Sequence, residues 1–326
     1  MIALGHQGRL VSLQAFGQRV LAPSPATMTP DTVFDLASLT KVVATAPAVL
    51  RLVDEGRLDL DAPAARYWPD FGANGKAVIT IRDLLTHFSG LRVGLDPRAG
   101  WDGEAGALAA IAAEKPVGPR GLRFSYSDED FIVLGEIVRR VSGVPLDVYC
   151  SRILFGPLGM AATGFRPGPA LRGRIAPSDN SASWLPQDPV ARRMGGVAGH
   201  AGLFGTAADL ARFARMILSG GELDGVRVLS ERSVTLMTSV QSPADQDVLR
   251  GLGWDIRSPF STDHTASFPD GSFGHTGYTG TSMWIDPPSG SFLIILANRL
   301  HPDGKGQVRS LRAGAAAAFV RAFSLP

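Results

Sequence analysis

Apolar and polar residues alternate near both ends of the chain, as they do in strands that are buried on one face. Residues 9–16 alternate and stop at Gly17. The pattern returns late in the chain, where Pro287-Pro288-Ser289-Gly290 separates two strand-like stretches in the manner of a hairpin turn. The late stretches are 252–256, 273–275, 282–286 and 292–297. Both ends of the chain are therefore predicted to contribute to one antiparallel sheet.

Between these ends, apolar positions recur at helical spacing. The first helix is predicted over 38–55 with Gly56 as its C-cap. Pro47 is expected to kink this helix, because proline cannot donate a hydrogen bond to the Val43 carbonyl. Further helices are predicted at 81–87, 105–115, 131–141, 145–155, 210–218, 230–237 and 308–323.

The section 58–205 has helical stretches and Gly/Pro loops but few strand-like runs. We therefore predict a mixed α/β (α+β) fold, in which 1–57 and 206–326 form an antiparallel sheet domain flanked by helices and 58–205 is an inserted all-helical lobe. Residues 164–199 are rich in Gly, Pro, Ser and Asp without periodicity, which predicts a long ordered loop, and such loops are often functional.

Composition limits the classes of partner. The chain has 326 residues, of which 45% are hydrophobic, so it can bury a large core. Its net charge is +2 and no block of like charges occurs, which argues against nucleic acid or an anionic membrane surface as a partner. The longest apolar run, 42–53, is interrupted by polar residues and is too short to span a bilayer. A small-molecule or peptide-like substrate is expected, and the oligomeric state stays open.

Cysteine and histidine spacing point away from disulfides and metals. Cys150 is the single cysteine, which excludes an internal disulfide and predicts a small core residue. No His/Cys/carboxylate grouping has zinc spacing, so no metal or cofactor is expected. The N-terminus lacks the basic region and long apolar core of a signal peptide, so a cytoplasmic location is the literal interpretation.

Candidate chemistry begins at Ser38, which opens the long apolar helix, with Lys41 three residues later. This spacing places a hydroxyl and an amine on one helical face, one turn apart. Serine needs a neighbour that takes its proton, and a lysine can do so if desolvation or nearby cations lower its pKa. A four-residue pattern occurs often by chance, and alone it equally fits a helix N-cap followed by a solvated lysine.

Two later clusters supply the missing context: Tyr126-Ser127-Asp128 at the entry of a helix, and His275-Thr276-Gly277 on a late strand. With Ser38 and Lys41, their order and separation resemble the class C β-lactamase superfamily of serine hydrolases, which includes penicillin-binding D,D-peptidases and esterases. The resemblance covers nearly the whole chain. It extends to the stretches 84–91, 124–128, 199–204 and 274–280.

The resemblance implies roles for these residues. Ser38 is the acylated nucleophile, and Lys41 and Tyr126 share proton transfer, with the base left open between them. A phenol ordinarily loses its proton near pH 10, so it serves as a base only where cations stabilise the phenolate, and Lys41 supplies one. The backbone N–H groups of Ser38 and Tyr278 form the oxyanion hole. His200, in a glycine-bounded turn, either contacts substrate or hydrogen-bonds within its loop.

Two departures from the family pattern bear on the substrate. His275 stands where a lysine is common, and since imidazole is mostly neutral at pH 7, recognition of a substrate carboxylate by 275–277 should be weakened. Asp128 replaces an asparagine, so a carboxylate acceptor stands where an amide could donate, and it could pair with Lys41. Both changes favour ester or amide hydrolysis, with Asp128, His275, Thr276 and Gly277 contacting substrate. His87 is predicted to be structural.

Three functions are therefore carried forward. The first is a serine hydrolase that cleaves an ester or amide through an acyl-enzyme on Ser38. The second is a penicillin-binding D,D-peptidase or β-lactamase, and the third is a non-catalytic protein that retains the fold. Relatives commonly carry an export signal, so a truncated N-terminus would make a periplasmic or secreted location the expectation.

Overall fold

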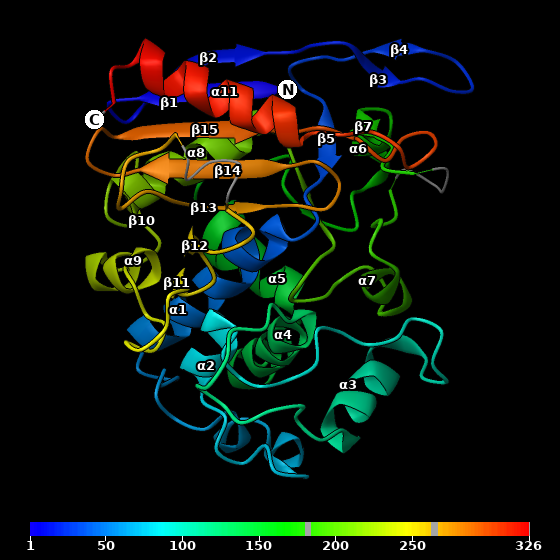
Figure 1. Cartoon of the computed structure of the whole chain (residues 1–326). Helices are drawn as coiled ribbons and strands as arrows, with labels where there is room; N and C mark the ends of the chain where they lie inside the picture. The colour runs from blue at the N-terminus through cyan, green and yellow to red at the C-terminus, as the bar shows by residue number, and fades with distance from the viewer. Residues whose placement is uncertain (180–183, 262–266, 326) are drawn as a thin grey trace.

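The computed structural model describes residues 1–179, 184–261 and 267–325 (Figure 1). Its largest sheet has the order β11-β12-β13-β14-β15-β1-β2, and every neighbouring pair is antiparallel. The strands are β1 (Ile2–His6), β2 (Arg9–Gln14), β11 (Leu249–Arg250), β12 (Asp255–Arg257), β13 (Phe273–Thr276), β14 (Ser282–Asp286) and β15 (Ser291–Ile295). The two ends of the chain thus meet in one sheet, as predicted.

Helices cover both faces of this sheet (Figure 1). α11 (Arg309–Ala322) packs on one face, and α8 (Ala207–Leu218) packs on the other. Because side chains alternate along a strand, β14 sends Trp284 toward α11 and its neighbours Met283 and Ile285 into the main core. The predicted hairpin of β14 and β15 and the predicted fold class are confirmed.

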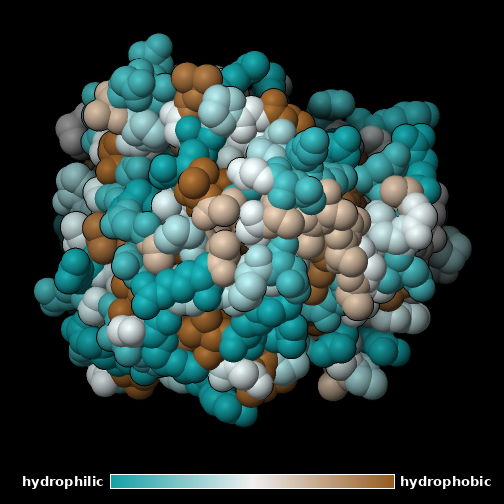
Figure 2. All heavy atoms as spheres, turned by 90° about the horizontal axis from the view of Figure 1, so that it is seen from below, coloured by the Kyte–Doolittle hydropathy of each residue, from teal (hydrophilic) through white to brown (hydrophobic). Residues whose placement is uncertain are grey.

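The helical lobe lies at the end of the molecule away from β2 (Figure 1). It contains α2 (Ile81–Thr86), α3 (Gly103–Ala113), α4 (Asp128–Ser142), and α5 (Leu146–Cys150), which continues as a π-helical turn, Ser151–Phe155, with short 3-10 turns at Ala64–Arg66 and Pro69–Gly72. Thr80 and Asp83 form a capping box at α2, and Ser127 accepts the Asp130 N–H at α4. Viewed from this end, hydrophilic residues dominate the surface and apolar residues are scattered (Figure 2).

The segment predicted as all-helical is not helical throughout. It contributes β6 (Gly164–Phe165), β7 (Ile175–Ala176) and β8 (Leu203–Gly205), which join β5 (Val33–Asp35) in a second sheet of order β6-β8-β5-β7. Strands of two or three residues are too short to show an alternating pattern, so the sequence could not reveal them. This sheet fixes β5 directly ahead of Ser38. The division into a sheet domain and an inserted lobe stays a proposal.

The predicted long loop over 164–199 also contains short helices where the structure describes it. These are α6 (Pro169–Arg172) and α7 (Pro189–Arg193), and 180–183 lie outside the described residues. The remaining elements are β3 (Gln18–Val20), β4 (Ala26–Thr27), β9 (Glu222–Leu223), β10 (Val226–Arg227) and α9 (Glu231–Thr238). No helix among the described residues is long and apolar enough to cross a membrane.

The helix that follows Ser38 contains a wide turn just ahead of Pro47, the residue at which the sequence predicts a kink. Lys41–Thr45 form a π-helical turn in which the Ala46 N–H donates to the Lys41 carbonyl, and α1 then runs over Ala46–Asp54. Pro47 thereby lies at the start of α1, where its missing N–H breaks no regular helical bond. Gly56 follows in the left-handed conformation, with φ of 67°, as expected of a C-terminal cap.

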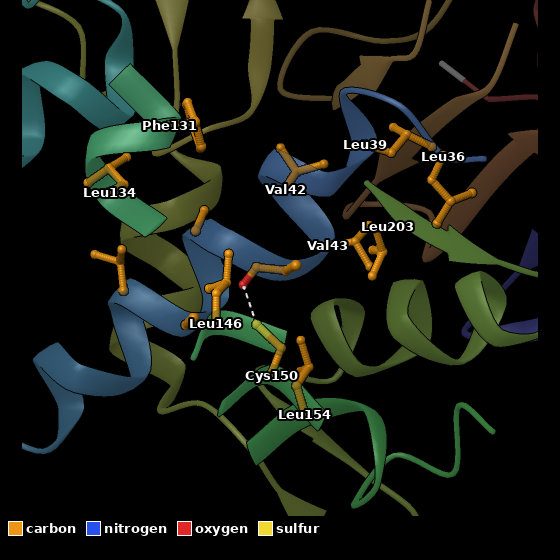
Figure 3. Packing of buried hydrophobic residues seen from close by; sticks show 14 of the residues in the cluster. Leu36, Leu39, Val42, Val43, Phe131, Leu134, Leu146, Cys150, Leu154 and Leu203 are labelled. Carbon is orange, nitrogen blue, oxygen red and sulfur yellow. Dashed lines mark hydrogen bonds between the residues drawn. The ribbon is translucent and has the colours of Figure 1, made fainter. Parts of the chain in front are cut away.

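Buried apolar side chains fill the contact between this helix and the lobe (Figure 3). Val42 and Val43 pack with Phe131 and Leu134 of α4 and with the segment around Cys150, and all are fully buried. Burial of each such side chain contributes about 1.5–3 kcal/mol to the free energy of folding. Cys150 is a core residue, as predicted, and its thiol donates to the Ala44 carbonyl over 3.6 Å. The first turn of the helix that follows Ser38 is therefore anchored rigidly.

Candidate active site

Ser38 lies in a sharp turn between β5 and the helix. Its neighbour Ala37 has φ of 47°, a left-handed conformation that costs free energy in a residue other than glycine. Asp35 holds the turn, because its carboxylate accepts the Ala37 N–H at 2.9 Å and the Gln187 N–H at 2.7 Å. Burial raises the pKa of Asp35 to about 6 despite these two bonds. Ser38 is thereby held half-exposed beside the cavity.

Lys41 is the centre of the hydrogen-bonding network. Its ammonium donates to Ser38 Oγ at 3.1 Å, to Asp128 Oδ1 at 2.7 Å and to the His200 carbonyl at 3.1 Å, and its side chain is fully buried. The pairing of Asp128 with Lys41 that the sequence suggested is thus present. All three donors of the ammonium have an acceptor, so its position is fixed.

The charge on Lys41 is also fixed. Burial alone lowers the pKa of Lys41, but the carboxylate of Asp128 and the phenol of Tyr126 more than offset it and raise that pKa to about 12. Lys41 is therefore protonated at neutral pH. The lowered pKa that a lysine base requires is not found in this structure.

Tyr126 converges on the same point, although it is far from Ser38 in sequence. The Lys41 ammonium lies 5.0 Å from the centre of the Tyr126 ring, and the His275 ring centre lies 5.9 Å from it. Tyr126 precedes Ser127, the N-cap of α4, so the helix start sets its place. Ser38, Tyr126, Asp128 and His275 line one cavity of about 860 Å³.

The end of β13 forms the opposite side of that cavity. Thr276, Gly277 and Tyr278 line it together with His275. A side chain at 277 would come within 2.8 Å of the Leu36 carbonyl, so only glycine permits this close approach to the nucleophile turn. Burial, followed by the charges of Arg250 and Lys41, holds the pKa of His275 well below its ordinary value. His275 is therefore neutral, as the sequence predicts for position 275.

His200 and Asp188 form a pair behind the Lys41 side of the cavity. The Nε2–H of His200 donates to Asp188 Oδ1 at 2.9 Å, and His200 is 1% exposed. Burial works to raise the pKa of Asp188, but His200 and the Ala191 N–H hold it well below its ordinary range. Asp188 lines the cavity and His200 does not, so the geometry gives His200 the loop-bonding role of the two that the sequence left open.

Three carboxylate and imidazole groups here lie close enough to hold a metal ion. Asp128, Asp188 and His200 each place one ligand atom within 4.8 Å of the others. The sequence does not show this grouping, because Asp128 is distant along the chain from Asp188 and His200, and these two are 12 residues apart. The ammonium of Lys41 is already bonded to Asp128, so a cation placed there would meet a fixed positive charge.

Sequence reasoning missed three arginines of this site. Arg250 is fully buried, donates to the Gly253 carbonyl at 2.8 Å and lies 3.4 Å from Asp255. Arg312, on α11, donates to the carbonyls of Gly277 and Thr281 at 3.1 and 2.7 Å. The third, Arg299, donates to the Tyr278 carbonyl at 2.7 Å. All three line the cavity. No motif could have marked them, because their burial and their closeness to the cavity are set by the fold.

Comparison with known proteins identifies the family of this chain. The family model described as Beta-lactamase matches residues 1–318. A provisionally named D-alanyl-D-alanine carboxypeptidase of Escherichia coli (strain K12) is 32% identical over 322 residues, which cover 86% of this chain and 72% of that protein.

Solved structures agree on the fold. A penicillin-binding protein homologue from Caulobacter crescentus superposes with a TM-score of 0.77 at 24% identity, covering 97% of this chain and 91% of that one. A family VIII carboxylesterase superposes with a TM-score of 0.75 at 23% identity, with coverage of 97% and 91%. The chain belongs to the β-lactamase family and is a serine hydrolase of that family.

Proposed function

We propose that this protein cleaves an ester or amide of a small-molecule or peptide-like substrate through an acyl-enzyme on Ser38. The observation that carries the proposal is the position of the Lys41 ammonium, 3.1 Å from Ser38 Oγ and 5.0 Å from the Tyr126 ring centre. A hydroxyl, a fixed cation and a phenol thus meet at the wall of a cavity large enough for a substrate.

Tyr126 is the base in this proposal, and Lys41 is its electrostatic support. Because Lys41 is protonated, it cannot accept the serine proton, but it stabilises negative charge on both Tyr126 and Ser38. Arg250 adds a second cation whose charge acts on Tyr126. The structure therefore favours one of the two bases that the sequence left open.

The oxyanion hole is assigned to the backbone N–H groups of Ser38 and Tyr278. Among the described residues, neither N–H has a hydrogen-bond acceptor. Arg299 bonds to the Tyr278 carbonyl and lies 4.6 Å from its ring centre, and Arg312 holds the Gly277 carbonyl. These bonds fix the turn, so that the Tyr278 N–H is preorganised for a developing oxyanion.

The proposed reaction has two stages. The phenolate of Tyr126 takes the Ser38 proton and becomes a neutral phenol while Oγ bonds to the substrate carbonyl carbon, and the carbonyl oxygen gains the negative charge. The C–O or C–N bond then breaks, and the leaving alcohol or amine receives the proton from Tyr126. Water repeats these steps with Tyr126 as the base and releases a carboxylic acid and free Ser38.

A second candidate is cleavage of peptides that end in a free carboxylate, as the name of the Escherichia coli relative suggests for that protein. Arg250 favours it, because this buried cation lines the cavity on the side of the neutral His275, and its Nε has no hydrogen-bond partner among the described residues. Position 275 is uncharged, so Arg250 is one of the cavity's arginines that could supply the missing attraction.

The test is a panel of p-nitrophenyl esters, nitrocefin and D-Ala-D-Ala peptides, assayed with the wild type and Ser38→Ala. We expect hydrolysis of at least one class and a loss of roughly 10³-fold or more in Ser38→Ala. Labelling by a fluorophosphonate should require Ser38. If neither the panel nor the probe reacts at Ser38, the non-catalytic alternative replaces the proposal.

A further inference from the structure

His87 is a buried histidine that lies directly against the proposed base. It ends α2 in the left-handed conformation with φ of 64° and is 0% exposed. Its ring centre lies 4.5 Å from that of Tyr126, with 41° between the two ring planes. His87 lines no cavity described above, so it does not contact substrate.

His87 also holds the backbone on both sides of Tyr126. Its carbonyl accepts the Ser125 N–H at 3.0 Å, and its Nδ1 accepts the Ser127 N–H at 3.2 Å. The residues before and after Tyr126 are thus hydrogen-bonded to the same residue whose ring packs on Tyr126. Three independent contacts therefore fix the position from which the phenol points toward Lys41.

We propose that His87 is a positioning residue for Tyr126, which holds the phenol in the place where Lys41 supports proton transfer. The inference rests on the proposed function, in which Tyr126 is the base. It assigns a role in the reaction to a residue that the sequence alone indicates as structural.

The ring must be neutral and in one tautomer to do this. A backbone N–H can only donate, so Nδ1 of His87 accepts from Ser127 and the ring proton is on Nε2. Asp130 Oδ2 lies 2.9 Å from the same Nδ1. Two hydrogen-bond acceptors cannot bond to each other, so Asp130 Oδ2 carries a proton and donates a hydrogen bond to Nδ1 of His87. The hydroxyl of Ser89 donates to the other carboxyl oxygen of Asp130.

The burial of this pair agrees with that assignment. Burial raises the pKa of Asp130 well above its ordinary value, and burial followed by the charges of Arg250 and Lys41 holds the pKa of His87 well below its own. A neutral ring leaves the positive charge near the phenol to Lys41 and Arg250, whose positions are fixed by hydrogen bonds.

Histidine is a costly choice at this position if packing is its only role. Its Nε2–H has no acceptor among the described residues, so a buried donor is left unpartnered. An aliphatic residue would fill the same space without a buried, unpartnered donor. What histidine adds is an acceptor, Nδ1, for the Ser127 N–H and a flat ring that packs on Tyr126.

The test is a double-mutant cycle of His87→Asn and Tyr126→Phe, with the rate of acylation by a fluorophosphonate and kcat/KM on the best ester as readouts. Asparagine is chosen because it adopts the left-handed conformation readily. We expect His87→Asn to slow acylation roughly 10- to 100-fold in the wild-type background, as loss of alignment does. In the Tyr126→Phe background we expect a further loss of less than about threefold.

Equal losses in both backgrounds would overturn the inference, because a merely structural residue acts independently of the phenol. Phe88→Leu is the matched control: Phe88 is the next residue, is fully buried, and its ring packs on Phe124. Its effect should be the same in both backgrounds. If His87→Asn is not recovered folded, His87→Gln takes its place in the cycle.

Asp130→Asn tests the proton assignment separately. An amide donates as a protonated acid does, so this variant should acylate within about threefold of the wild type, and a larger loss would contradict the assignment. Failure of the proposed function looks different, because Tyr126→Phe alone would then leave the acylation rate unchanged. A slow Tyr126→Phe together with a normal His87→Asn would overturn only the inference.

Discussion

The two walls of the cavity carry opposite charges and come from different parts of the molecule. The lobe side presents Asp128, at the start of α4, and Asp188, the N-cap of α7. The sheet side presents Arg250, Arg299 and Arg312 around the end of β13. Each wall is anchored differently: the carboxylates bond to Lys41 and His200, and the arginines bond to backbone carbonyls.

This difference separates two tasks that the family pattern alone does not distinguish. The lobe wall sets the charge state of Lys41, the lysine of the proposed mechanism, because the carboxylate of Asp128 raises its pKa. The sheet wall shapes the proposed oxyanion site and provides the positive charge that His275 lacks. Changes on the lobe wall should therefore affect the chemical step, and changes on the sheet wall should affect the choice of substrate.

The largest effect is expected from Lys41→Met. It removes the cation that the lobe wall holds and leaves Asp128 without a partner. We expect a loss of roughly 10³-fold or more in kcat/KM, because the phenolate and the attacking oxygen lose their nearest positive charge. Steady-state kinetics on the best ester measures it.

Lys76→Met is the matched control for that variant. Lys76 is a second fully buried lysine, and its ammonium donates to the Ala112 carbonyl at 3.0 Å, away from the cavity. Its loss should lower stability but leave kcat/KM within about twofold of the wild type. An equal loss of activity in both variants would show that burial of the charge, and not its place beside Ser38, explains the effect.

The next effect concerns the lobe wall just behind Asp128. Glu129 is 1% exposed, and burial followed by the charge of Glu114 raises its pKa to about 8. The pKa of this carboxyl is higher in the folded than in the unfolded protein. The protein therefore loses stability as the pH rises from the unfolded-state pKa of about 4.5 through the folded-state pKa of about 8. Glu129→Gln should therefore lie within about 1 kcal/mol of the wild type near pH 5 and exceed its free energy of unfolding at pH 9 by roughly 4–5 kcal/mol.

Urea unfolding at the two pH values measures this difference. Glu231→Gln is the control, since the Glu231 side chain is 80% exposed on α9 and should show no pH-dependent difference. A Glu129→Gln variant that gains nothing at pH 9 would mean that the lobe wall tolerates a further negative charge without cost.

The smallest effect is expected on the sheet wall. Arg250→Lys keeps a charge but loses the planar group that bonds to Gly253 and faces Asp255. We expect kcat/KM to fall roughly 10- to 30-fold for a substrate with a free carboxylate and less than about threefold for a neutral ester. Equal losses for both substrates would contradict the division of tasks between the walls.

Much of the fold could be predicted from the chain. Most strands of the main sheet and the capped helices α2, α4 and α8 have strong local signals, such as alternation and the Thr80 and Ser127 caps. The strands β1 and β11 of that sheet were not predicted, and neither were the short strands β3 to β10. Short strands depend on partners distant in sequence, so their residues carry too little pattern.

The candidate site was predictable where its residues are close together in the sequence and belong to one motif. Ser38 and Lys41 lie one turn apart, and their bond follows from that spacing. The sequence suggested that Asp128, 87 residues away, pairs with Lys41, but it did not show that Lys41 is fully buried, so the balance that sets its charge was not predictable. Arg250 and the place of His87 under Tyr126 likewise arise only when strands and helices meet.

The wide turn over Lys41–Thr45 holds one residue more than a regular helical turn would. One extra residue rotates the later part of the helix by about 100° relative to its first turn. Ser38 can therefore line the cavity, with Lys41 bonded to it from behind, while Val49 and Leu52, beyond the wide turn, face the interior. Deleting a single residue from this turn would force a choice: either the reactive side chains would swing away from the substrate, or the apolar stripe of α1 would swing out of the core.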